Sequence, residues 1–249
     1  ASLVTCFLIS LYAIAQIPSG ERASAPFEGK TGEPNTLGGY LVFMLAIVTG
    51  LILTPGATSR RLPLFILLIA GSVGLAATLS RSSFLAAAVV LMIVVGRVMF
   101  RKPLLAPVIL IALLASPWWV PEAVTQRIFY TFTQPVEEGQ IRMGTVRVDT
   151  STSDRLRSWK KSVDIWKTYP LLGAGVTGGP FMDAMYPRVL SETGTVGLVA
   201  FFILIGALFR MGFAAHRQAH DPFARGLALG FLLGFAGLLV HAIGANSFI

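Results

Sequence analysis

The stretch Thr150–Gly194, with the sequence TSTSDRLRSWKKSVDIWKTYPLLGAGVTGGPFMDAMYPRVLSETG, is the polar interruption in a chain that is otherwise mostly apolar. Its first part has the period of a helix, because large apolar residues recur at spacings of three, four and three: Leu156, Trp159, Val163 and Trp166. Charged residues fill much of the remaining surface, and Pro170 marks the expected end. The pattern therefore predicts an amphipathic helix, followed by a turn at Leu171–Gly175.

The sequence predicts how this helix begins but leaves open what it packs against. The Ser and Thr residues at 150–153 are typical of an N-terminal cap, and Asp154 is then expected in the first turn, where the helix dipole favours a carboxylate. A basic helix with two tryptophans on its apolar face is typical of a membrane surface and attracts anions. The same periodicity fits a helix that packs against its own loop, so both interpretations stay open.

The composition is that of an integral membrane protein. Of the 249 residues, 54% are hydrophobic and only 13% are charged, and the mean hydropathy is +0.72. The single cysteine, Cys6, excludes an internal disulfide framework and a cysteine-based metal site. The histidines are too scattered for a zinc site, so the sequence predicts no metal and no other cofactor.

The two ends of the sequence both lie in apolar runs. Ala1 opens directly into one, without the positive region of a signal peptide, and Ile249 stands inside another without a charged flank. We therefore expect this chain to be a piece of a longer membrane protein.

Apolar segments long enough to cross about 30 Å of hydrocarbon as helices recur along the chain. They lie near 1–17, 37–54, 62–80, 83–100, 104–120, 189–210 and 224–245. The expected fold is an all-α, polytopic transmembrane bundle of about seven helices. It has three regions: helices one to five over 1–120, a large extracytoplasmic (periplasmic) loop over 121–188 with the amphipathic helix, and helices six and seven over 189–249.

Basic residues set the orientation of such a chain. With the 18–36 loop outside, three short loops face the cytoplasm, and their only acid is Asp221 against these basic residues: Arg60, Arg61, Arg97, Arg101, Lys102, Arg210, Arg217 and Arg225. The long 121–188 loop mixes both signs and translocates largely regardless of charge. The net charge of +8 is therefore a topology signal, and no nucleic-acid partner is expected.

Two motifs fall on the predicted outer side. Pro34–Tyr40 runs from a turn into a helix that Asn35 or Thr36 is expected to cap, with glycines that allow close helix packing. Arg81 lies in the very short turn Thr78–Ser83, against the positive-inside trend, and no acidic residue is within reach in the sequence. Such an arginine is costly unless it has a partner or binds an anion. Snorkelling to lipid headgroups is the alternative.

Polar residues also accompany the last two segments. His241 and Asn246 lie in or near the last one, where they indicate either a functional role or interhelical hydrogen bonding. Glu192 lies at the outer start of the sixth segment. It is expected to cap that helix or to pair with an arginine, and contact with substrate is the alternative.

Together these motifs resemble the O-antigen ligase and O-antigen polymerase superfamily. The resemblance runs from about Pro26 to Ile249 and is carried, in order, by Pro34-Asn35, Ser80-Arg81, Arg155-Leu156 with Trp159, Tyr169–Gly175, Asp183–Tyr186 and Leu190–Gly194. It implies a mostly α-helical membrane glycosyltransferase of the GT-C class, usually with ten or more spanning helices, in the bacterial cytoplasmic (inner) membrane. Such enzymes serve lipopolysaccharide and other cell-envelope polysaccharide biosynthesis, and they work without a metal.

The resemblance also implies the substrates. The donor is a glycan on an undecaprenyl-diphosphate carrier, and the acceptor is lipid A-core in a ligase or another carrier-linked repeat unit in a polymerase. Membrane lipids surround both. The His-Asn pair of the ligases falls on Asp183 and Ala184 here. This departure favours a polymerase or another member of the superfamily.

Roles for single residues follow from the same resemblance. The two arginines that hold the carrier diphosphate map onto Arg81 and Arg155, which we expect to meet on the non-cytoplasmic surface and to stabilise the leaving group. Asp183 is the expected base for the acceptor hydroxyl, or a group that positions substrate. Further substrate-binding residues are predicted to be Arg157, Trp159, Lys160, Tyr186 and Glu192.

Two other functional classes compete with an enzyme. A transporter or flippase of lipid-linked glycans needs polar residues along its spanning helices, whereas 37–54 and 83–100 are nearly free of them apart from Gly, Ser and Thr. Such a protein is also expected to show a repeated pattern of broken helices, and the sequence has no convincing internal repeat. A membrane scaffold accounts for the apolar helices but not for Arg81 beside a basic outer loop.

Overall fold

The structure, a computed structural model, describes residues 1–26, 32–59, 61–105, 107, 121–137, 140–143 and 146–248. Nearly all of its regular structure is helical, as expected. The elements are α1 (Ser2–Ala15), η1 (Ile17–Ser19), α2 (Pro34–Leu53), α3 (Arg61–Ala77), α4 (Arg81–Arg101), η3 (Pro103–Leu105), α6 (Glu122–Thr133), β1 (Arg142–Met143), β2 (Val146–Arg147), α7 (Thr150–Thr168), α8 (Met185–Gln218) and α9 (Pro222–His241). The two short strands pair antiparallel, Arg142 opposite Arg147.

The chain forms two compact units. Unit 1 comprises Ala1–Gln126 and Gly212–His241, and unit 2 comprises Arg127–Met211 and Ala242–Ile249. Unit 1 therefore holds α1 to α4 and α9, while unit 2 holds the strand pair, α7 and most of α8.

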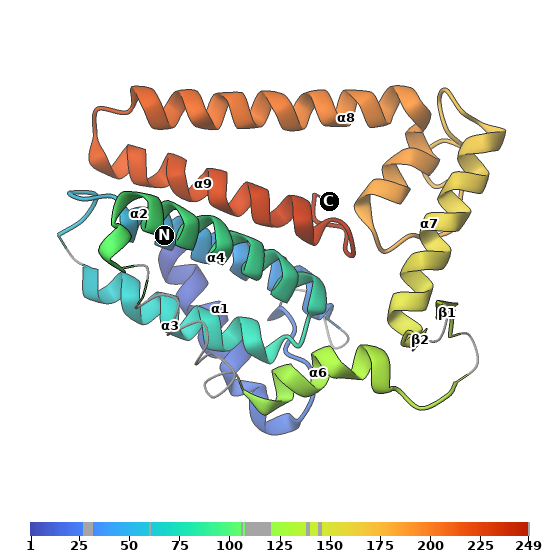
Figure 1. Cartoon of the computed structure of the whole chain (residues 1–249), viewed down its shortest axis with the longest axis horizontal. Helices are drawn as coiled ribbons and strands as arrows, with labels where there is room; N and C mark the ends of the chain where they lie inside the picture. The colour runs from blue at the N-terminus through green and yellow to red at the C-terminus, as the bar shows by residue number, and fades with distance from the viewer. Residues whose placement is uncertain are drawn as a thin grey trace. The chain divides into compact units, whose positions relative to one another are not determined.

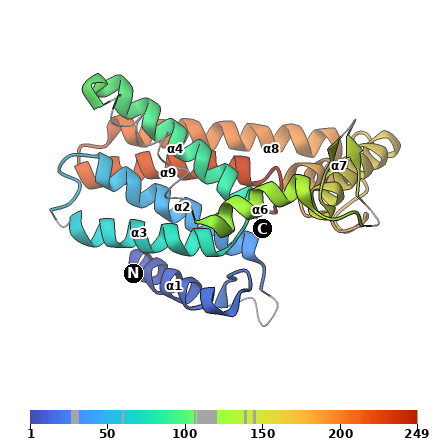
Figure 2. The same ribbon diagram turned by 60° about the horizontal axis from the view of Figure 1, so that its bottom comes forward.

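Unit 1 is a bundle in which α2 is the central helix. Figures 1 and 2 show its helices running side by side, and α2 packs against α9, α3 and α4, while α1 packs mainly on α3. The core is aliphatic and includes the fully buried side chains of Leu37, Leu41 and Val48. Small residues let the backbones approach closely, since a Cβ atom at Gly50 would collide with the backbone of Gly230 in α9. Close packing through small residues is the usual basis of helix association in lipid.

Five described helices are long and apolar enough to cross a membrane: Ser2–Ser19, Pro34–Leu53, Arg81–Arg101, Met185–Gln218 and Pro222–His241. The apolar helix α3 is shorter, at 17 residues. Six of the predicted segments thus coincide with apolar helices. The remaining one, 104–120, lies outside the described residues apart from 104, 105 and 107, and so does Arg60 of the predicted cytoplasmic charges.

The predicted segment 189–210 is wrong at its start, because α8 contains a sharp break. Gly194 has φ +62° and ψ −160°, outside helical geometry. The Tyr186 and Phe202 rings stack with centroids 6.2 Å apart and planes at 14°, whereas a straight helix would separate these residues by about 24 Å. The part of α8 before Gly194 therefore folds back against the part after it, as Figure 1 shows.

Candidate functional site

The amphipathic helix predicted around Trp159 is α7, and it ends at Thr168, just before Pro170. Its cap differs from the expectation. The Asp149 carboxylate, and not a Ser or Thr side chain, accepts a hydrogen bond from the Thr152 N–H at 3.1 Å, and the Gln134 side chain accepts one from the Thr150 N–H at 2.8 Å. Because the helix begins at Thr150, Asp154 lies beyond its first turn, so its predicted place there was wrong.

One face of α7 packs against the rest of unit 2. Ser162 is fully buried and donates to the carbonyl oxygen of Pro187 at 2.6 Å. The Trp166 indole N–H donates to the Thr195 hydroxyl at 2.9 Å. These bonds bear out the interpretation in which the helix packs on its own surroundings. They leave its charged face directed outward.

The charges of that face are not equivalent. Arg155 is half-buried, whereas Lys160 is exposed and forms no ion pair within the described residues. Arg157 pairs with Asp154 at 2.6 Å. Solvent screens an exposed pair of this kind, and Lys160 has no such partner in the part of the chain that the structure describes. The face therefore keeps positive charge that can attract an anion.

The turn after α7 is bonded into the break of α8. Four backbone hydrogen bonds join the two segments: Ala174 N to Ser191 O at 2.8 Å, Gly175 N to Glu192 O at 3.0 Å, Thr195 N to Pro170 O at 2.9 Å, and Val196 N to Leu171 O at 3.1 Å. A break in a helix leaves N–H and carbonyl groups without their usual partners, and within a membrane such groups have no water to bond. We call this arrangement, residues 170–175 with 191–196, the clasp. Its turn donates to carbonyl groups before the break of α8 and accepts from N–H groups after it.

Two glycines make the clasp possible. Gly173 and Gly194 have φ values of +69° and +62°, in the left-handed region that glycine occupies without penalty. Added Cβ atoms would also collide, at Gly173 with the Glu192 carbonyl group and at Gly194 with the Leu171 carbonyl oxygen. The sequence motifs Leu171–Gly175, predicted as a turn, and Leu190–Gly194, at the predicted start of a helix, are therefore hydrogen-bonded to each other in one structure.

Asp183 lies just before α8, and Glu192 lies near the end of the first part of α8, before the break at Gly194. Asp183 is exposed but flanked by Met182 and Ala184, which are 2% and 0% exposed, so its backbone is anchored while its carboxylate faces outward. Glu192 accepts a hydrogen bond from the Arg188 Nε at 3.1 Å, and both side chains are partly buried. The pairing expected for Glu192 is confirmed. Arg188 was missed as its partner, although a spacing of four residues in a helix indicates such a contact.

Trp159 and Tyr186, both predicted to bind substrate, line one apolar pocket in unit 2. Its volume is about 320 Å³, and its other walls are Leu190, Leu198, Phe202 and Ile243. Trp159 comes from α7, and the remaining α8 residues come from both sides of the Gly194 break. The folding back of α8 therefore creates this pocket beneath the basic helix that carries Arg155.

Arg81 belongs to unit 1 and is the first residue of α4, not part of a loop. The turn before it is tightly held: the Thr78 hydroxyl donates to the Leu75 carbonyl at 2.7 Å, and Leu79 adopts φ +46°, which is rare for a bulky residue other than glycine. Ser80 caps the helix by accepting from the Ser83 N–H at 3.4 Å. The turn thus fixes the backbone from which the Arg81 side chain starts.

The cap predicted for α2 is different in the structure. Neither Asn35 nor Thr36 caps it, because the N-cap residue is Glu33 and no side chain completes the cap. The Asn35 amide instead donates to the Glu33 carboxylate at 2.7 Å and accepts from the Ser80 hydroxyl at 2.7 Å. The two motifs predicted to share one membrane side are therefore in contact at one end of unit 1.

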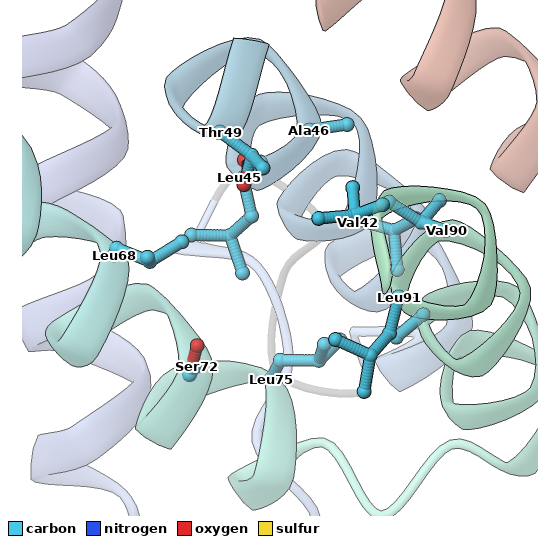
Figure 3. Close-up of a pocket in the computed structure, with 11 residues that line it drawn as sticks. Val42, Leu45, Ala46, Thr49, Leu68, Ser72, Leu75, Val90 and Leu91 are labelled. Carbon is cyan, nitrogen blue, oxygen red and sulfur yellow. Dashed lines mark hydrogen bonds between the residues drawn. The ribbon is translucent and has the colours of Figure 1, made fainter. Parts of the chain in front are cut away.

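A further cavity of about 240 Å³ lies within unit 1 among α2, α3 and α4 (Figure 3). Its walls are aliphatic except for Thr49 and Ser72, and the Thr49 hydroxyl already donates to the Leu45 carbonyl at 2.7 Å. None of the side chains lining this cavity is charged. It therefore suits an apolar chain and not a diphosphate.

The predicted site residues are thus distributed over both units. Unit 2 contains most of them, namely Arg155, Arg157, Trp159, Lys160, Asp183, Tyr186 and Glu192, and unit 1 contains Arg81. In the part of the chain that the structure describes, no three His, Cys, Asp or Glu side chains gather as a metal ion would require.

Comparison with known proteins identifies the family of the chain. A search of curated proteins found no match. The family described as O-antigen ligase matches residues 65–197, which is more than half of the chain and contains every predicted site residue. The chain therefore belongs to the O-antigen ligase family.

Proposed function

We propose that this protein is a membrane glycosyltransferase that transfers or polymerises glycan from an undecaprenyl-diphosphate carrier, without a metal, on the outer face of the bacterial cytoplasmic membrane. Membership of the O-antigen ligase family supports a glycan-transferring enzyme of the membrane. The observation that carries the finer proposal is the apolar pocket in unit 2, which α8 forms together with Trp159 of the basic helix α7.

This pocket suits the two-part chemistry of the donor. A prenyl diphosphate is an apolar chain joined to a strongly anionic group. The pocket offers only apolar walls, whereas the outward face of α7 offers Arg155, Arg157 and Lys160. Apolar burial favours the first isoprene units in the pocket, and guanidinium groups favour the diphosphate beside it.

Arginine chemistry accounts for the catalytic step. The acceptor oxygen forms a bond to the anomeric carbon, and the bond from that carbon to the diphosphate breaks with its electron pair leaving on the diphosphate. Negative charge on the leaving group therefore grows in the transition state, where fixed guanidinium groups stabilise it. We assign this role to Arg155 of unit 2 and Arg81 of unit 1, with Arg157 or Lys160 as a supporting charge.

Asp183 is proposed as the base for the acceptor hydroxyl. As the new bond forms, the hydroxyl proton passes to the Asp183 carboxylate, which keeps the reaction balanced in atoms and charge. Its exposed side chain and anchored backbone are consistent with this task. Glu192, paired with Arg188, is proposed to orient the polar groups of the substrate.

Purified full-length protein in vesicles, incubated with a prenyl-diphosphate oligosaccharide, tests the proposal. The expected result is a new glycosidic product with release of prenyl diphosphate. Movement of the intact donor across the vesicle membrane without product would instead identify a transporter or flippase and overturn the proposal. Parallel reactions with lipid A-core and with a second carrier-linked repeat unit separate a ligase from a polymerase.

A further inference from the structure

A continuous line of polar side chains crosses the end of unit 1 where α2 and α4 begin and α9 ends. His241 Nε2 lies 3.1 Å from the Ser83 hydroxyl, which donates to the Ser80 hydroxyl at 2.8 Å. The Ser80 hydroxyl donates to the side-chain oxygen Oδ1 of Asn35 at 2.7 Å, and the side-chain nitrogen Nδ2 of Asn35 donates to the Glu33 carboxylate at 2.7 Å. Ser80 and Ser83 are fully buried and His241 is 1% exposed. We call these residues the His241 chain.

The direction of every hydrogen bond in the His241 chain follows from its surface end. The Glu33 carboxylate accepts, so the Asn35 amide nitrogen faces Glu33 and the Asn35 oxygen faces Ser80. Each serine has one hydroxyl proton, and these protons are used toward Asn35 and toward Ser80. Ser83 therefore has only a lone pair to offer His241, and His241 must carry a proton on Nε2 and donate it.

The neighbouring helix α2 is shaped to admit this contact. A Cβ atom at Gly38 would collide with the Ser83 hydroxyl oxygen, and one at Gly39 would lie 3.1 Å from His241 Cε1. Adjacent glycines thus leave room for both partners of the central hydrogen bond. Buried polar side chains that are fully bonded in this way make a structure rigid, because each unmade bond is costly in a low dielectric.

We propose that His241 is a positioning residue, which holds the first turn of α4 through Ser83 and Ser80 and so fixes the direction of Arg81. Ser80 is both a member of the His241 chain and the N-cap of α4, and Arg81 follows it directly. The left-handed Leu79 on the other side of Ser80 is a conformation that persists only when its surroundings hold it. This inference rests on the proposed role of Arg81 in glycan transfer, and both Asn35 and His241 lie outside the range that the family matches.

The test compares full-length variants with two independent measurements. His241→Leu removes the donor, His241→Gln retains an N–H near the position of Nε2, and Ser83→Ala removes the central link with little change in volume. Ser82→Ala is the matched control, because Ser82 is also buried in the first turn of α4 but has no side-chain hydrogen bond within the described residues.

Hydrogen–deuterium exchange of the peptide that covers 78–84 reports how readily this turn opens, without any substrate. We expect faster exchange there in His241→Leu and Ser83→Ala, and wild-type exchange in His241→Gln and Ser82→Ala. In the transfer assay, the first two variants should lose about 10- to 100-fold in kcat, the cost of a misplaced catalytic group. His241→Gln should restore most of it.

Unchanged exchange at 78–84 in both His241→Leu and Ser83→Ala would overturn the inference, whatever the activity. Altered exchange with full activity would overturn the link to Arg81. If the wild-type protein transfers no glycan but the exchange pattern holds, the proposed function fails while His241 remains the residue that positions Arg81. If His241→Leu does not fold, Ser83→Ala and Ser82→Ala carry the same comparison.

Discussion

Tyr186 and Phe202 stack with nearly parallel ring planes and ring centroids 6.2 Å apart although both belong to α8. The contact exists because the helix turns back at Gly194. It brings the first part of α8 beside the second and closes the apolar pocket that Trp159 also lines. The non-helical conformation of Gly194 is therefore required for this pocket of unit 2.

The first prediction concerns this glycine. Gly194→Ala places a Cβ atom in the left-handed region and against the Leu171 carbonyl oxygen. The conformational penalty at φ +62° and ψ −160°, a region that essentially only glycine occupies, is about 1–3 kcal/mol, and the collision adds to it. We expect a lower apparent Tm in detergent and loss of donor binding. Gly206→Ala is the control in the same helix, since Gly206 has no atom within 4 Å of an added Cβ. Equal Tm values for the two variants would contradict the clasp.

The second prediction tests the packing of α7. Ser162→Ala removes the hydrogen bond that the Ser162 hydroxyl donates to the buried Pro187 carbonyl oxygen at 2.6 Å. One buried hydrogen bond contributes about 0.5–1.5 kcal/mol, so the apparent Tm should fall. Ser158→Ala is the control, because Ser158 is on the same helix and makes no side-chain hydrogen bond within the described residues. The two variants differ only if this face is packed as the structure has it.

Much of the fold could be predicted because lipid imposes long apolar helices. Hydropathy located α2, α4 and α9 to within a few residues. It failed at Gly194, where the short polar stretch Ser191–Thr195 leads directly into the apolar run, since hydropathy records polarity and not backbone direction. A glycine in a helical pattern is also explained by close helix packing. The sequence pattern therefore did not predict the positive φ at Gly194.

The candidate site could be predicted only in part, because local patterns do not report distant partners. The sequence pattern predicted that the Ser and Thr residues at 150–153 cap α7, whereas the side chain that caps it is that of Asp149, directly before them. His241 drew attention as an intramembrane polar residue, but Ser83, its partner in α4, is remote in sequence. A pairing of Glu192 with an arginine was predicted, but its partner Arg188 was not named, although it is one helical turn away.

The third prediction separates a diphosphate-binding charge from a merely basic helix. Arg155→Ala should lower kcat/KM for the prenyl-diphosphate donor by about 10²–10³-fold, as expected when one charge-stabilising donor is lost. Lys167→Ala is the control on α7, because Lys167 is exposed and pairs with Asp164 at 3.6 Å. Similar small losses in both variants would mean that α7 contributes only general electrostatic attraction.

The last prediction concerns Asp183 as a base. Asp183→Asn keeps the shape of the side chain but cannot accept the hydroxyl proton, so kcat should fall by about 10²–10⁴-fold. Because Asp183 is exposed, the apparent Tm of this variant should remain that of the wild type, and donor KM should change little. Asp183→Glu keeps a carboxylate and should retain more activity than Asp183→Asn. If Asp183→Asn transfers glycan at the wild-type rate, the proton goes elsewhere and Asp183 is not the base.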